Sequence, residues 1–190
     1  MTAQEARWER RLESLWASFD DHGPGDFLRR VESLAAELPP GDAVALYELA
    51  SAHDALGREE GAAALYRRAL AAGLPDGRRR RAVIQLASTL RNLGRTEESI
   101  ALLTAERELR SDELDDAVTA FLSLALADAG REREAAALAL TALVPHLPEY
   151  RRSLTYYARA LTTGDGARPG SGTAAVPGPP SAHTRAAPGP

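Results

Sequence analysis

The stretch ALYELASAHDALGREEGAAALYRRALAAGLP, residues 45–75, decides the fold. Two later stretches have the same order of features: VIQLASTLRNLGRTEESIALLTAERELR at residues 83–110 and TAFLSLALADAGREREAAALALTALVPHLP at residues 119–148. Each contains a segment with helical apolar periodicity, a Gly-Arg pair, an acidic turn and a second such segment. The three copies therefore predict three helix-turn-helix units in an all-α chain.

The glycines of the three turns give the repeat length. Gly57, Gly94 and Gly130 are separated by 37 and 36 residues. Glycine suits the left-handed backbone conformation at the end of a helix, so we expect each to end the first helix of its unit. Units of this kind stack into a right-handed solenoid, an α-α superhelix. With the helical segments on either side, the chain is expected to form about nine antiparallel helices.

The repeats resemble those of the tetratricopeptide repeat (TPR) family, and in particular short bacterial TPR proteins. The family signature has a tryptophan, a small residue and a tyrosine in the first helix of each unit. The corresponding positions match in residue class, with departures: Leu46, Val83 and Thr119; Ala50, Ala87 and Ser123; His53, Leu90 and Leu126. The resemblance covers about residues 43–148. It implies a protein–protein interaction scaffold or adaptor with a concave groove that binds a peptide or protein segment.

Three regions are predicted along the chain. Residues 1–40 carry helical stripes at 4–19 and 26–38, which are expected to form a helix pair capping the stack. Residues 41–162 hold the three repeats and a C-terminal capping helix, in one continuous domain with residues 1–40. Residues 163–190 are rich in Gly, Pro and Ala with almost no charge, which is typical of a disordered tail.

The composition excludes several kinds of chemistry. The chain has no cysteine, and all 23 of its basic residues are arginine because lysine is absent. Disulfides, thiolate chemistry, Schiff-base lysines and phosphate-binding P-loops are therefore excluded. The four histidines are scattered and form no helical metal-binding pair. We predict a non-catalytic protein with no catalytic residues, no metal and no cofactor.

The resemblance also implies where a ligand lies. In the TPR family the first helix of each unit lines the groove. The residues on the exposed face of those helices are the expected peptide-binding or protein-binding site: Tyr47, Ser51, Asp54, Ile84, Gln85, Ser88, Arg91, Asn92, Phe121, Leu124 and Asp128.

Two other functions remain open from the sequence. Trp8 and Trp16 share one helical face, so they either pack in the core or form the interface of a homodimer. The run Arg78–Arg81 either is a solvated loop and helix start, or it contacts nucleic acid as part of a regulatory subunit. The net charge of −4 argues against nucleic acid. No signal peptide or membrane-spanning run is recognisable, so a cytoplasmic protein without a membrane partner is expected.

Overall fold

The computed structural model describes residues 2–109 and 112–163. Within these ranges the chain forms nine α-helices and two short 3-10 turns and contains no strand, which confirms the predicted all-α fold. The helices are α1 (Ala3–Ala17), α2 (Pro24–Ala35), α3 (Ala43–Ala55), α4 (Glu59–Ala71), α5 (Asp76–Asn92), α6 (Thr96–Leu109), α7 (Asp115–Asp128), α8 (Glu132–Leu143) and α9 (Arg151–Thr162). Apart from Thr163, the predicted disordered tail at 163–190 lies outside the described residues.

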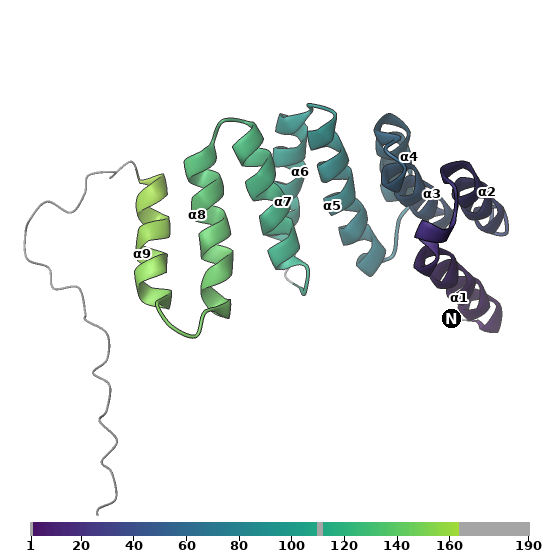
Figure 1. The fold of residues 1–190 in the computed structure, drawn as a ribbon, viewed down its shortest axis with the longest axis horizontal. Coiled ribbons are helices and arrows are strands. Elements are labelled where there is room, and N and C mark those ends of the chain that lie inside the picture. The colour runs from purple at the N-terminus through teal and green to yellow at the C-terminus, as the bar shows by residue number, and fades with distance from the viewer. Residues whose placement is uncertain (1, 110–111, 164–190) are drawn as a thin grey trace, which may run out of the picture.

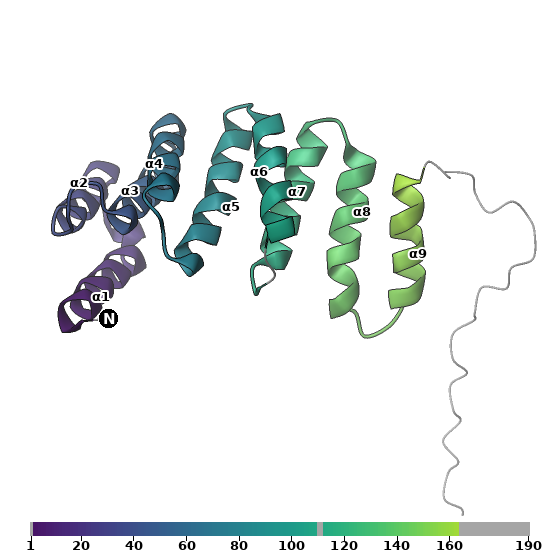
Figure 2. The same ribbon diagram turned by 180° about the vertical axis from the view of Figure 1, so that it is seen from behind.

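The helices α3 to α9 stand in a row, with α1 and α2 together at the end opposite α9 (Figure 1, and from behind in Figure 2). The pairs α3/α4, α5/α6 and α7/α8 are the three predicted helix-turn-helix units, and α4 packs on α5 as α6 packs on α7. This stacking of neighbours is the predicted helical-repeat solenoid. No helix in the described part of the chain is both long enough and apolar enough to cross a membrane.

The turn inside each unit has the same hydrogen-bonded geometry. In the second unit Gly94 is left-handed, with φ of +73°, and the backbone N–H of Arg95 donates to the carbonyl of Leu90 at 2.8 Å. This six-residue closure is a Schellman motif, which satisfies a carbonyl left over at the helix end. The equivalent bonds join Arg58 to His53 at 2.8 Å, beside Gly57, and Arg131 to Leu126 at 2.9 Å, beside Gly130. The predicted role of the three glycines is confirmed.

The core is a series of three clusters along the row. Phe27 and Val31 are fully buried in the first, between the N-terminal helices and α3. Tyr66 lies at the centre of the second, between α3, α4 and α5. Leu103 and Val118 anchor the third, which joins α5 to α8. Each helix pair therefore depends on its neighbours for burial of its apolar face.

The N-terminal helix α1 begins at a capping box, in which Thr2 and Glu5 exchange side-chain-to-backbone hydrogen bonds. It packs on α2, which packs on α3. The side chain of Trp8 is 6% exposed, and its indole Nε1 donates to the carbonyl of Leu34 at 2.9 Å. Trp8 therefore packs in the core and is not available as part of an exposed homodimer interface, contrary to that hypothesis.

Candidate functional site

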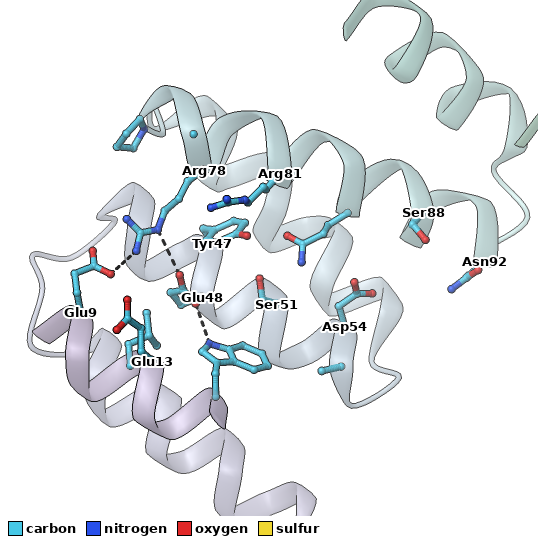
Figure 3. A pocket seen from close by; sticks show the side chains of 16 residues that line it. Glu9, Glu13, Tyr47, Glu48, Ser51, Asp54, Arg78, Arg81, Ser88 and Asn92 are labelled. Atoms are coloured by element: carbon cyan, nitrogen blue, oxygen red, sulfur yellow. Dashed lines mark hydrogen bonds and ion pairs between the residues drawn. The ribbon is translucent and has the colours of Figure 1, made fainter. Parts of the chain in front are cut away.

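A cleft of about 980 Å³ opens between α1, α3 and α5, and α3 lies between the other two helices (Figure 3). Six of the eleven predicted groove residues line it: Tyr47, Ser51 and Asp54 from α3, and Gln85, Ser88 and Asn92 from α5. Within each helix these residues are three or four positions apart, so their side chains share one helical face. The repeat pattern thus brings the first helices of two units to one cleft.

The other five predicted residues do not line this cleft. Ile84 is buried in the third core cluster, because it is one position from Gln85 and so points about 100° away around the helix. Phe121 packs partly against the same cluster. The remaining three lie where α5 faces α7: Arg91 Nη1 bonds Asp128 Oδ2 at 2.9 Å, and Leu124 is exposed.

Sequence reasoning missed the wall that α1 contributes. Glu9, Leu12, Glu13 and Trp16 all line the cleft, because α1 lies across from α3 and α5 instead of only covering the end of the stack. The one signal in the sequence is the width of the apolar stripe on α1. Trp8, Leu12 and Leu15 are buried on this stripe. Trp16 lies at its edge, where its ring packs on Phe27 of α2, with centroids 5.0 Å apart, and also borders the cleft.

One end of the cleft is crossed by charged side chains. Arg78 of α5 reaches Glu9 of α1, with Nη2 and Oε2 2.5 Å apart, and its Nε lies 3.5 Å from Glu48 Oε1 of α3. Trp16 Nε1 donates to the other oxygen of Glu48 at 3.1 Å. These contacts, drawn as dashed lines in Figure 3, tie α1 to both of the helices across from it. We call this group the Glu48 bridge: Glu9, Trp16, Glu48 and Arg78.

Glu48 is an unusual carboxylate because its side chain is almost completely buried. Burial raises its pKa above the ordinary glutamate value, and the hydrogen bond from Trp16 and the charge of Arg78 oppose that rise. Asp54, further along the same helix, accepts a hydrogen bond from Thr89 Oγ1 at 3.0 Å. Its pKa is also raised, mainly by burial. The floor of the cleft therefore holds two carboxylates in poorly solvated positions.

Residues 78–81 lie in the first turns of α5, as the helix-start interpretation predicted, but of the four arginines only Arg81 is exposed. Arg80 is 1% exposed, and its guanidinium lies 2.7 Å from Asp112 and 2.7 Å from Asp115, so it is neither solvated nor free to contact nucleic acid. Arg79 makes a bidentate bond to the buried carboxylate of Glu106, at 2.9 and 2.7 Å. Arg79 and Arg80 thus join α5 to α6 and to the start of α7.

In the run, Arg81 alone makes no ion pair with another described residue; it is exposed on the wall of the cleft (Figure 3).

Among the described residues, no group of three or more His, Asp or Glu side chains is arranged to hold a metal ion. His183 lies outside the described residues. The arrangement as a whole offers a polar cleft with an apolar edge formed by Trp16 and Leu12.

Comparison with known proteins gives one result. The sequence model of the family described as Tetratrico peptide repeat matches residues 43–161, which include all three helix pairs and all but the last residue of α9. Searches of curated proteins and of solved structures gave no match.

Proposed function

The chain belongs to the tetratricopeptide repeat family, and we propose on that basis that it is a non-catalytic scaffold that binds a segment of a partner protein in the cleft between α1, α3 and α5. TPR domains generally mediate protein–protein interaction, and the family is typically non-catalytic. The observation that carries the proposal is the position of the cleft. It lies on the first helices of two consecutive units and is lined by six residues that the repeat pattern singles out.

The shape and lining of the cleft support binding of a polypeptide segment. Its volume of about 980 Å³ is at the upper end of the range for ligand pockets, which leaves room for several side chains. Trp16, which is half-buried, offers aromatic surface, the residue type that contributes most to binding at protein interfaces. Ser88 and Asn92 add polar groups from α5 that can bond to a peptide backbone.

The test is site-specific photo-cross-linking, since the absence of lysine prevents amine-reactive cross-linking. A benzophenone amino acid replaces Asn92, which is exposed in the cleft, in cells of the source organism. The control carries it at Arg68, which is exposed on α4 and does not line the cleft. We expect a protein adduct from position 92 that position 68 does not give.

A second variant shows whether the adduct depends on the cleft. Ala55 is an exposed cleft residue, so Ala55→Trp fills that end without disturbing the core, and Ala64→Trp on α4 is the matched control. The adduct should be lost with Ala55→Trp and kept with Ala64→Trp. Equal adducts from positions 92 and 68, or an adduct unaffected by Ala55→Trp, would refute the proposal. Arg91 is unsuitable here because its substitution also breaks the ion pair with Asp128.

A further inference from the structure

The cleft has an excess of negative charge. Its lining contains four carboxylates, Glu9, Glu13, Glu48 and Asp54, and two guanidiniums, Arg78 and Arg81, which gives a formal net charge of −2. Arg78 is already shared by Glu9 and Glu48 within the Glu48 bridge. One cation therefore serves two carboxylates within the cleft, and the excess of negative charge remains.

Two further carboxylates have no cationic partner. Glu13, exposed on α1, forms no ion pair or hydrogen bond with any other described residue. Asp54, half-buried on α3, accepts a neutral hydrogen bond from Thr89 but pairs with no arginine or histidine in the described ranges. A buried carboxylate without a counter-ion is costly, and a cation supplied from outside would lower that cost.

A neutral acceptor in the same cleft points to the same kind of ligand. Gln85 projects from α5 into the cleft, and its side-chain oxygen Oε1 is buried with no donor among the described residues. Buried polar atoms in folded proteins almost always have a hydrogen-bond partner. The acceptor at Gln85 and the carboxylate of Asp54 would both be satisfied by N–H donors, which ammonium and guanidinium groups present in excess.

From these observations, and resting on the proposed function of the cleft, we propose that the cleft binds a basic segment of a partner protein, with a lysine or arginine side chain placed between Glu13 and Asp54. The aromatic face of Trp16 contacts the stem of that side chain or an apolar neighbour. Arg81 repels the positive charge of the ligand, so the cation binds on the side of the cleft away from Arg81. The raised pKa of Asp54 fits this arrangement, because a bound cation stabilises its charged form.

The test selects peptides without assuming their charge. A phage-displayed library of random 12-residue peptides is panned on the immobilised full chain, in parallel with Ala55→Trp and Ala64→Trp. Selected peptides are synthesised and their Kd values measured by fluorescence anisotropy. We expect peptides enriched in Lys and Arg that bind the wild type and Ala64→Trp but not Ala55→Trp.

Two charge variants then locate the site. Glu13→Gln with Asp54→Asn should raise the Kd of a selected basic peptide roughly tenfold, because two attractive charges are removed. Asp54→Asn keeps an acceptor for Thr89, and circular dichroism confirms folding. The control, Asp20→Asn with Glu108→Gln, makes the same charge change at exposed positions outside the cleft and should leave Kd unchanged. Arg81→Gln should lower Kd about twofold to threefold.

The outcomes separate this inference from the proposed function. Acidic or uncharged peptides that are lost with Ala55→Trp would overturn the basic ligand and leave the binding cleft intact. If the selected peptides bound Arg81→Gln more weakly than the wild type, that result would also overturn the basic ligand and leave the binding cleft intact. Selection of no peptide, or of peptides that bind Ala55→Trp as well as the wild type, would overturn both. Basic peptides whose Kd is insensitive to Glu13 and Asp54 would refute the placement of the cation.

Discussion

Replacing Arg80 with methionine is the most direct test of what holds the second repeat in place. The guanidinium of Arg80 is 1% exposed and lies 2.7 Å from both Asp112 and Asp115, and its Nε lies 3.7 Å from Glu106. Methionine fills much of the same space and removes the charge. The substitution leaves three carboxylates that were arranged around one cation.

The expected loss follows from how well each carboxylate can be satisfied without Arg80. Removing one partner of a buried ion pair costs about 3–5 kcal/mol. Asp112 and Asp115 have side chains 28% and 44% exposed, so water can replace the guanidinium there. Glu106 stays buried, but it keeps the bidentate bond from Arg79. We therefore expect the lower end of the range, a loss of about 3 kcal/mol, which corresponds to a fall in Tm of roughly 6–12 °C.

The assay is urea denaturation followed by circular dichroism, with two companion variants. Arg81→Met changes the neighbouring exposed arginine and should alter stability by less than about 0.5 kcal/mol. Arg80→Lys keeps the charge but loses the planar fork, so its loss should fall between those of the other two. An Arg80→Met protein as stable as Arg81→Met would show that the buried cluster contributes nothing net, and would refute this reasoning.

Three further substitutions test the turns, the helix packing and the cleft. Gly94→Ala forces a side chain into a backbone with φ of +73° and should cost about 1–2 kcal/mol in urea denaturation; no change would contradict the strain. Gly61→Ala places a Cβ 2.7 Å from the ring of His53 and should lower Tm, whereas Gly77→Ala meets nothing within 4 Å and should not. For Glu48→Gln, the free energy of unfolding of the variant minus that of the wild type should increase as pH rises from about 4.5. The raised pKa means that the folded wild type holds that proton more tightly than the unfolded chain and loses stability once it is released, so a pH-independent difference would contradict the burial effect.

The features that sequence reasoning predicted correctly are those set by neighbours along the chain. The left-handed glycines, the helix pairs and six of the predicted groove positions on α3 and α5 follow from local conformational preference and from a period of 3.6 residues per turn. Gln85 and Ile84 show the limit of this reasoning. A one-residue difference in phase decides between cleft and core, and the periodicity of a helix with mixed residues does not fix that phase.

The features that it missed depend on contacts between distant segments. Arg80 and Glu106 are 26 positions apart, yet each side chain is 1% exposed, because Asp112 and Asp115 neutralise Arg80 and Arg79 neutralises Glu106. Glu48 and Trp16 are a similar case, since the hydrogen bond between them exists only once α1 lies across from α3. Composition and spacing carry no information on such pairing, so the α1 wall of the cleft could not be predicted from them.

The position of Trp16 makes the protein its own optical sensor. The chain has two tryptophans, and only Trp16 borders the cleft, with its indole N–H bonded to a carboxylate. Trp8 is held in the core by a backbone carbonyl. In a Trp8→Phe protein all remaining indole emission comes from the cleft wall, so its wavelength and quenching follow the arrival of a ligand without any attached dye. In a Trp16→Phe protein the surviving signal follows the melting of the first two helices, so the two single-tryptophan variants report ligand binding and local unfolding separately.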